Sequence, residues 1–382
     1  MRQIYCDNSS TSFPKAPGLG RIMGEHIDNN GYNISRGAYG GAYSVERRVM
    51  EARELLCDCF DAEEPRNVIF TSGATMGLNT VLRGVLKPGD HVITTAMEHN
   101  AVVRPLAQLA KDGVIWEEAP CDETGALNIE QFKKMIRPES KMVMATHGSN
   151  VCGTLMPIEE IGVICKAHDI LFAVDASQTA GSVPVSMRTC RADALVFPAH
   201  KGLMGPQGIG AMILSKRFSE ICEPVVCGGT GSLSHEETMP DFMPDKFQPG
   251  TLNIPGIIGM NHALKFVRQE GINSIGEKKL ELAGMFIEEA MNMKGVALAG
   301  IASVEGRCAV VSLDFADIDN AEAGYYLENR FGIMTRCGLH CAPHAHKTLG
   351  TFPEGTVRFS FGFFNTKEEV RIAADAVREI LK

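Results

Sequence analysis

Two cysteines and three histidines lie within ten residues of one another in the segment TRCGLHCAPHAHKT, residues 335–348. Thiolates and imidazoles bind metals, form redox pairs, and act as nucleophiles with acid–base partners. One candidate is a tetrahedral zinc site built from Cys337, Cys341, His344 and His346, although the spacing is cramped and the metal would consume a nucleophile. The segment alone does not decide among these chemistries, so the rest of the chain must show what surrounds it.

Length and composition exclude several classes of protein. The chain has 382 residues, of which 45% are apolar and 22% charged, as in ordinary globular proteins. Its net charge of −9 argues against nucleic-acid binding, which needs clustered Lys and Arg. No apolar run approaches the roughly 20 residues of a membrane helix, and the opening MRQIYCDNSS lacks the pattern of a secretory signal. We therefore expect a cytoplasmic protein with no membrane or nucleic-acid partner, whose twelve cysteines are mostly small core residues.

Short apolar segments alternate with helical or polar segments in the first part of the chain. Val45, Val49, Leu56 and Phe60 have helical spacing and predict a helix over 42–61. Short buried strands that alternate with helices predict a mostly parallel sheet covered on both faces. The expected strands are NVIFTSG (67–73), HVITTA (91–96), KMVMATH (141–147), ILFAVDA (170–176), ADALVFPA (192–199) and GIGAMILS (208–215).

The second part of the chain has a different pattern. Residues 227–256 show no period and are rich in Gly and Pro, which predicts a long loop with a function or a partner. Residues 257–292 are helical in pattern, and 307–315 predict a strand. Thr366 and Glu369 form a capping-box pattern for a last helix.

These patterns predict an α/β fold with two domains. The larger domain, residues 15–256, would contain the mostly parallel sheet. The smaller α+β domain, residues 257–382 together with 1–14, would carry the segment of cysteines and histidines.

Polar residues follow the predicted strands at the point where each strand ends, and in open α/β sheets ligands bind at these carboxyl ends. Each group taken singly is more often a cap or a solvated loop. Together they supply a helix start for a phosphate, an imidazole, a carboxylate, amides and a lysine, which is the set that a pyridoxal phosphate site requires. No G-x-G-x-x-G opens the first strand–helix unit, which argues against a dinucleotide site. The groups are Thr71–Thr75, Met97–Asn100, His147–Asn150, Asp175–Gln178 and Ala199–Lys201.

Seven motifs, in chain order, resemble those of the cysteine desulfurases and selenocysteine lyases. This family consists of fold type I pyridoxal phosphate enzymes of the class V aminotransferase group, with a large α/β domain and a smaller α+β C-terminal domain. The resemblance extends from YCDNSSTS at the start to the last helix. The motifs are TSGAT, EHN, SNVCGT, DASQTAG, HKGLMGPQGIGA, RCGLHCA and VRFSFGFFNT.

The resemblance implies roles for individual residues. Lys201 would form the Schiff base with pyridoxal 5'-phosphate, Asp175 would keep the ring nitrogen protonated, and His99 would stack on the ring. Arg358 would bind the substrate carboxylate, with Asn150 and Arg336 also at the substrate. The remaining cofactor contacts would come from Ala74, Thr75, Asn150, Gln178, His200 and, from the neighbouring subunit of a homodimer, Thr251.

The resemblance also implies a reaction for the opening segment. Cys341 matches the nucleophilic cysteine of R-x-G-x-H-C-A, so Lys201, Cys341 and His99 would be the catalytic residues. The enzyme would convert L-cysteine to L-alanine and leave a persulfide on Cys341, from which a sulfur-acceptor protein would take the sulfur. Because the thiolate is the nucleophile, Arg336 and His340 would help by favouring it.

Other functions stay open at the level of the sequence. A selenocysteine lyase, another pyridoxal phosphate-dependent C–S lyase or an aminotransferase would share the scaffold, and a non-catalytic metal-binding or scaffold protein is the alternative from a different class. Cys337 could resolve the persulfide as a disulfide, but filling space is the simpler interpretation. Pro198 stands where the family commonly has a phosphate-binding serine. The sequence PHAHKTLGTFPEGT after Ala342 differs from the SUF-type enzymes, so the acceptor is not indicated.

Overall fold

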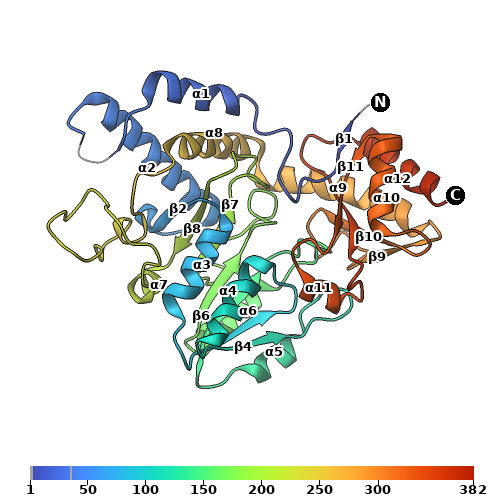
Figure 1. Ribbon diagram of the computed structural model, residues 1–382, viewed down its shortest axis with the longest axis horizontal. Coiled ribbons are helices and arrows are strands. Elements are labelled where there is room, and N and C mark those ends of the chain that lie inside the picture. Colours follow the sequence, from blue (N-terminus) through green and yellow to red (C-terminus); the bar gives the residue numbers. More distant parts are fainter. Residues whose placement is uncertain (1–2, 35–36) are drawn as a thin grey trace.

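The computed structural model describes residues 3–34 and 37–382. The molecule is elongated, with a larger part around a wide sheet and a smaller part at the end where β1 (Ile4–Tyr5) and the C-terminus lie (Figure 1). Within the described residues no helix is long and apolar enough to cross a membrane.

Among the described residues, seven strands form the sheet of the larger part. β3 pairs in parallel with β4 and β5, and the parallel pairing continues through β6 to β7. β8 runs antiparallel to both of its neighbours, β2 and β7. In sheet order the strands are β2 (Val68–Thr71), β8 (Gly210–Leu214), β7 (Ala194–Pro198), β6 (Leu171–Asp175), β5 (Ser140–Thr146), β3 (His91–Thr95) and β4 (Ile115–Ala119).

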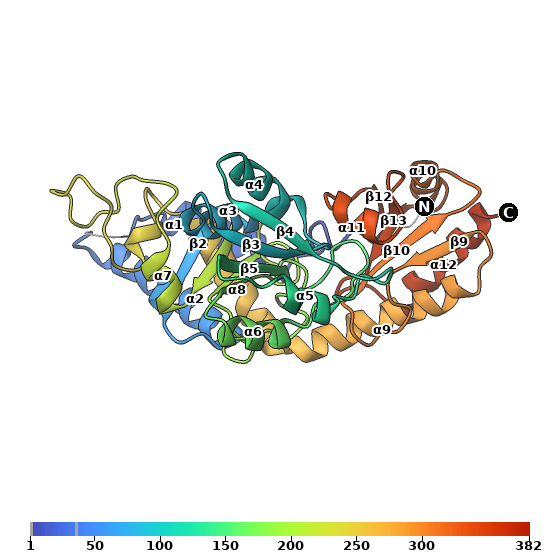
Figure 2. The ribbon, with the colours of Figure 1, turned by 90° about the horizontal axis from the view of Figure 1, so that it is seen from below.

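Helices cover both faces of this sheet, which explains why its central strands are continuous apolar runs. Side chains alternate between the faces: Phe172 and Val174 of β6 belong to one core cluster, and Leu171 and Ala173 to the other. Figure 2 shows α3 and α4 on one side and α2, α6 and α8 on the other. The first face carries α3 (Ala74–Val85), α4 (Asn100–Lys111) and α7 (Lys216–Ile221). The second face carries α2 (Gly40–Phe60), α6 (Ile158–Ala167) and α8 (Ile254–Glu270). Outside these lie α1 (Leu19–Asn30), α5 (Ile129–Met135) and the short turns η1 (Pro65–Asn67) and η2 (Asp245–Phe247).

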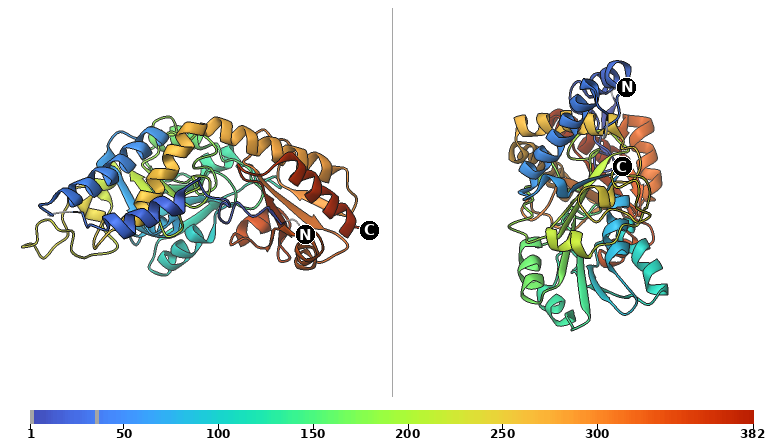
Figure 3. Two further views of the ribbon diagram at one scale, coloured as in Figure 1. Left: turned by 90° about the horizontal axis from the view of Figure 1, so that it is seen from above. Right: turned by 90° about the vertical axis from the view of Figure 1, so that its left-hand side faces the viewer.

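In the described part of the smaller end, four strands form a second, antiparallel sheet in the order β12-β13-β10-β9. Figure 3 shows α9 and α12 lying side by side against it. β1 pairs in parallel with β11, so the start of the chain is part of this smaller unit. The elements are β9 (Val296–Ala299), β10 (Val310–Phe315), β11 (Ile333–Met334), β12 (Arg336–Gly338), β13 (Thr356–Ser360), α9 (Ile272–Met291), α10 (Asn320–Phe331), α11 (Pro343–Thr348) and α12 (Lys367–Ile380).

The α/β architecture predicted from the sequence is confirmed. Each expected strand is present, with slightly shorter bounds or, for β5, with bounds shifted by one residue. The capping box of Thr366 and Glu369 at the start of α12 is also present. The strand β4 was not expected, because its residues alternate between exposed and partly buried at the sheet edge and form no apolar run. Helix α8 packs against α1 and α2 in the larger part, whereas α9 packs on β9 and α12. The domain boundary at residue 256 stays a prediction.

Candidate active site

A cavity of about 340 Å³ lies at the carboxyl ends of the parallel strands, where α3 begins. This is the edge at which the sequence predicted a ligand site. It brings together most of the predicted cofactor contacts. Its lining includes Ala74, Thr75, His99, Asn150, Asp175, Gln178, Pro198, His200 and Lys201.

One end of the cavity suits a phosphate. Helix α3 begins after Gly73, and no side chain caps its first turn, so the N–H groups of Ala74 and Thr75 lie beside the cavity without a capping partner. His200 Nδ1 is buried without a partner among the described residues. Burial lowers the pKa of His200 to about 4, and Lys201 acts in the same direction. A neutral imidazole can donate a hydrogen bond to an anion from the nitrogen that carries the proton. Pro198 lines the cavity but offers no hydroxyl.

Asp175 and Lys201 also line the cavity. Asp175 ends β6, is 3% exposed, and accepts a hydrogen bond from the backbone N–H of Ser177 at 2.9 Å. Burial raises the pKa of Asp175, opposed by the hydrogen bonds from Ser177 and by the charge of Lys201. Burial lowers the pKa of Lys201 to about 8, opposed by Asp175. A lysine with a lowered pKa has a larger fraction of neutral, nucleophilic amine at neutral pH.

His99 is held in one orientation by its own helix. It is the N-cap of α4, and its Nδ1 accepts a hydrogen bond from the backbone N–H of Ala101 at 3.0 Å. The neutral ring therefore carries its proton on Nε2. Burial lowers the pKa of His99 to about 4, and the nearby Lys201 contributes to this shift. A neutral, fixed imidazole facing the cavity fits the predicted stacking role.

Glu98, next to His99, was missed by the sequence analysis. It is fully buried, and its Oε1 accepts hydrogen bonds from the Thr95 hydroxyl at 2.6 Å and from the Thr146 backbone N–H at 2.8 Å. Its Oε2 is buried without a partner among the described residues. Burial raises the pKa of Glu98 to about 8, and Asp175 adds to the shift. Glu98 is therefore a mostly protonated carboxyl at neutral pH, behind a strand end that carries the site.

Arg358 and Arg336 lie opposite each other on β13 and β12 of the smaller sheet, outside the set of residues that line the cavity. Arg358 is 1% exposed, and its guanidinium donates to the backbone oxygen of Asn150 and to Asp7 Oδ1, both at 2.9 Å. Burial lowers the pKa of Arg358, opposed by Asp7. Its Nε is buried without a partner in the described chain. Asn150 links this arginine to the cavity, which supports the predicted carboxylate site.

The Cys341 loop does not line the cavity but is hydrogen-bonded to Asn150, which does. The backbone oxygen of Cys341 accepts from the N–H of Asn100 at 2.7 Å, and the backbone oxygen of His340 accepts from the Asn150 amide at 2.7 Å. His340 and Cys341 both have positive φ, 48° and 59°, a conformation that is uncommon for non-glycine residues. The Cys341 thiol is exposed, and Arg336 Nη2 lies 3.6 Å from its sulfur. The opening segment thus presents a thiol beside a guanidinium.

The other members of that segment have separate partners. His344 pairs with Glu118 and stacks on Trp116, whereas His346 is buried and hydrogen-bonded to Thr351. Cys337 packs against the core of the smaller part, and a Cβ on Gly324 would meet its sulfur. In the described residues no group of His, Cys, Asp or Glu could hold a metal. Cys337, His344 and His346 therefore do not form the zinc site with Cys341 that was considered above.

His340 is buried, and its Nε2 is 3.0 Å from the Thr356 hydroxyl. Burial lowers the pKa of His340 to about 2, with Arg358 as the next contributor, so the ring is neutral. Arg336 is the group whose Nη2 lies next to the sulfur. A role of His340 in favouring the thiolate stays a prediction.

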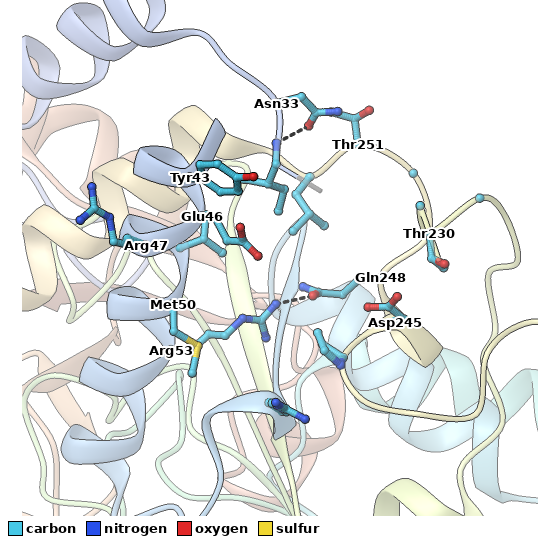
Figure 4. A pocket seen from close by; sticks show the side chains of 18 residues that line it. Asn33, Tyr43, Glu46, Arg47, Met50, Arg53, Thr230, Asp245, Gln248 and Thr251 are labelled. Atoms are coloured by element: carbon cyan, nitrogen blue, oxygen red, sulfur yellow. Dashed lines mark hydrogen bonds between the residues drawn. The ribbon is translucent and has the colours of Figure 1, made fainter. Parts of the chain in front are cut away.

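Thr251 lies in a different cavity of the same chain, with a volume of about 870 Å³ (Figure 4). It is exposed on the loop after η2, and Figure 4 shows it beside Asn33. Gln248, farther into the same cavity, accepts a hydrogen bond from the buried Arg53. The structure does not bring Thr251 into the Lys201 cavity. A contribution to the site of a second subunit stays a prediction.

The comparisons with known proteins identify the family of the chain. The aminotransferase class-V family matches residues 4–372, so the chain belongs to that family. The chain is 31% identical over 99% of its length to probable cysteine desulfurases from Methanothermobacter thermautotrophicus and Pyrococcus abyssi, covering 94% of each. The apo structure of a cysteine desulfurase from Thermococcus onnurineus NA1 has a TM-score of 0.91 at 30% identity, covering 99% of this chain and 94% of that one. CsdA from Escherichia coli, a cysteine desulfurase, gives 0.89 at 25% identity, covering 99% and 94% of the two chains.

These findings confirm the fold type I architecture and pyridoxal phosphate as the cofactor. The residues fit that group. The uncapped start of α3 and the unpartnered His200 Nδ1 suit its phosphate, and the buried Asp175 suits its protonated ring nitrogen. Lys201 lies in the same cavity for the aldehyde carbon.

Proposed function

We propose that the protein is a pyridoxal phosphate-dependent cysteine desulfurase that converts L-cysteine to L-alanine with formation of a persulfide on Cys341. The observation that carries this proposal is the exposed Cys341 thiol, on a loop whose backbone oxygens accept hydrogen bonds from Asn100 and from Asn150, a residue that lines the Lys201 cavity. The names of the relatives, cysteine desulfurases over nearly the whole chain, support the same reaction.

The chain's own residues divide the tasks of binding. Ala74, Thr75 and His200 would hold the phosphate, and Gln178 and Asn150 would contact the ring hydroxyl. Asp175 would hold the ring nitrogen, and His99 would cover the ring face. Pyridoxal phosphate supplies an imine-forming carbonyl and an electron sink for the substrate's α-carbon. The substrate carboxylate binds Arg358, whose unpartnered Nε offers a donor in addition to those used by Asp7 and Asn150.

Lys201 and Cys341 then move the proton and the sulfur. Lys201 Nζ, once freed as a neutral amine, accepts the proton from the substrate's α-carbon. The Cys341 thiolate attacks the substrate sulfur, so that an Sγ–S bond forms while the substrate's Cβ–S bond breaks and its electrons remain with the carbon fragment. Protonation of that fragment gives alanine. Cys341 retains the sulfur as a persulfide, and a thiol of an acceptor removes it.

The proposal includes partners beyond the described chain. A homodimer would bring Thr251 of one subunit to the phosphate of the other, because Thr251 is exposed and lies outside its own Lys201 cavity. A sulfur-acceptor protein would reach Cys341 from solvent, in the cytoplasm. L-selenocysteine is a second candidate substrate, since selenium leaves more readily than sulfur and depends less on the thiolate.

The test measures alanine formation from L-cysteine and from L-selenocysteine by the holoenzyme and by Cys341→Ala. We expect the variant to lose alanine formation from cysteine and to retain it from selenocysteine. Cys227→Ala, which removes another exposed thiol, is the matched control and should leave both rates unchanged. If the parent enzyme forms alanine from neither substrate, the assigned reaction is wrong, and another lyase or an aminotransferase takes its place.

A further inference from the structure

The hydroxyl of Ser10 joins the two arginines of the site. Its oxygen accepts from Arg358 Nη2 at 2.8 Å and from Arg336 Nη1 at 3.0 Å, and the hydroxyl donates to Asp7 Oδ1 at 2.8 Å. A serine hydroxyl has a single proton to donate and two lone pairs to accept with. These contacts therefore use its full capacity, and any rotation of the side chain breaks at least one of them.

The same network reaches the proposed nucleophile. Arg336 uses Nη1 for Ser10 and presents Nη2 to the Cys341 sulfur at 3.6 Å. Because the guanidinium is planar, fixing one nitrogen fixes the direction of the other. Without Ser10, Arg336 would be a partly exposed side chain on the short strand β12, with many rotamers open to it.

Two neighbouring positive charges, those of Arg336 and Arg358, have to be accommodated around the Ser10 hydroxyl. Arg336 and Arg358 are cations at neighbouring places, and β12 and β13 pair them directly across the sheet. Like charges directly opposite in a sheet repel. Asp7 offsets one of the two charges through its ion pair with Arg358. The Ser10 oxygen, which both cations share, allows the second arginine to stay close while it faces the sulfur.

We propose that Ser10 is a positioning residue that orients Arg336 toward Cys341 and, through the same hydroxyl, ties the Arg358 carboxylate site to the nucleophile. The role of Cys341 as nucleophile rests on the proposed function, but the orientation of Arg336 does not. A guanidinium held at the sulfur is in place to pair with the thiolate, which is the form that reacts.

The test is the rate at which iodoacetamide alkylates Cys341 in the substrate-free holoenzyme at pH 7.5, followed by mass spectrometry of the peptide that contains Cys341. We expect Ser10→Ala to slow this alkylation by about 3- to 10-fold, the equivalent of one neutral hydrogen bond. Ser10→Thr, which keeps the hydroxyl, should restore most of the rate. The exposed Cys227 in the same sample is an internal control and should react equally fast in every variant.

Two further variants make the result decisive. Arg336→Met should slow alkylation of Cys341 at least as much as Ser10→Ala, and the double variant should be no slower than Arg336→Met alone. Ser303→Ala, at an exposed loop serine, should change nothing. If Ser10→Ala leaves the rate at Cys341 unchanged while Arg336→Met lowers it, or if all peptides change together, the inference about Ser10 is wrong. Because no turnover is measured, failure of the desulfurase assignment would show separately as absent alanine formation by the parent enzyme.

Discussion

Lys201 and Cys341 carry the chemistry of the proposed site from opposite environments. Lys201 lies in a cavity lined by buried groups, where loss of water sets the protonation of Lys201, His99 and Asp175. Cys341 lies on an exposed loop, and its neighbouring charge comes from an arginine that is itself partly exposed. Loss of water is therefore the main cause of the pKa shifts around Lys201. The main electrostatic neighbour of the Cys341 sulfur is instead a charge that solvent can reach. An acceptor must reach the sulfur, whereas water must stay away from the carbon chemistry.

The buried side should give the largest effect when its amine is removed. We expect Lys201→Ala to lower alanine formation by roughly 10⁴-fold, because both the covalent attachment and the proton acceptor are lost. The measurement is alanine production together with the yellow absorbance of the bound cofactor, which should shift in the variant. Lys216→Ala, at an exposed lysine, is the control. Normal turnover by Lys201→Ala would exclude the assigned role.

The next effect should appear where the two regions meet. Arg358→Lys keeps the charge but loses the planar fork, so we expect KM for L-cysteine to rise about 10- to 100-fold, with a smaller change in kcat. Steady-state kinetics of alanine formation separates the two parameters. The exposed Arg371→Lys on α12 is the matched control. An unchanged KM would place the substrate carboxylate elsewhere.

Burial of Glu98 in the Lys201 region should also make the free energy of unfolding depend on pH. The pKa of Glu98 is raised from 4.5 to about 8. Between pH 4.5 and about pH 8, therefore, Glu98 keeps its proton in the folded protein and loses it in the unfolded chain. Stability contributed by this group is complete below about pH 4.5 and is lost as the pH rises toward 8, by up to roughly 5 kcal/mol.

Glu98→Gln removes that titration while its side-chain oxygen can still accept from Thr95 and Thr146. We therefore expect the Tm of the variant, relative to the parent, to rise between pH 6 and pH 9. The measurement is thermal unfolding of both holoenzymes at each pH. A constant difference in Tm across this range would show that Glu98 ionises normally.

The exposed region should respond to salt instead. Raising NaCl from 0.05 to 0.5 M should slow alkylation of Cys341 about 2-fold, because ions screen the attraction between Arg336 and an exposed sulfur. The pH at which the cofactor absorbance titrates should move less, since its surroundings are buried. If salt changes the titration of the cofactor absorbance more than it changes the alkylation rate of Cys341, the proposed contrast between the two regions is wrong.

The sequence predicted the part of this site that follows from strand ends and motif order. Asp175 is the last residue of one buried strand and Lys201 follows the end of the next, and parallel strands bring such ends together. The contacts that the sequence could not predict are those between distant segments. Ser10 and Arg358 are 348 positions apart, and no local pattern indicates that they touch. Glu98 was missed because its burial depends on the strands around it, although it adjoins a predicted site residue.

The first described residues connect the two ends of the chain in a way that bears on synthesis. Asn8 and Ser9 hydrogen-bond to Ser360, and Asp7 pairs with Arg358. During translation the N-terminal segment therefore waits until residues 358–360 have been made before it finds these partners. The larger sheet can form earlier, since its strands end by residue 214. The cofactor cavity would thus be shaped early, whereas the arginines and the thiol would join it only after about another 140 residues, which delays sulfur chemistry relative to cofactor binding.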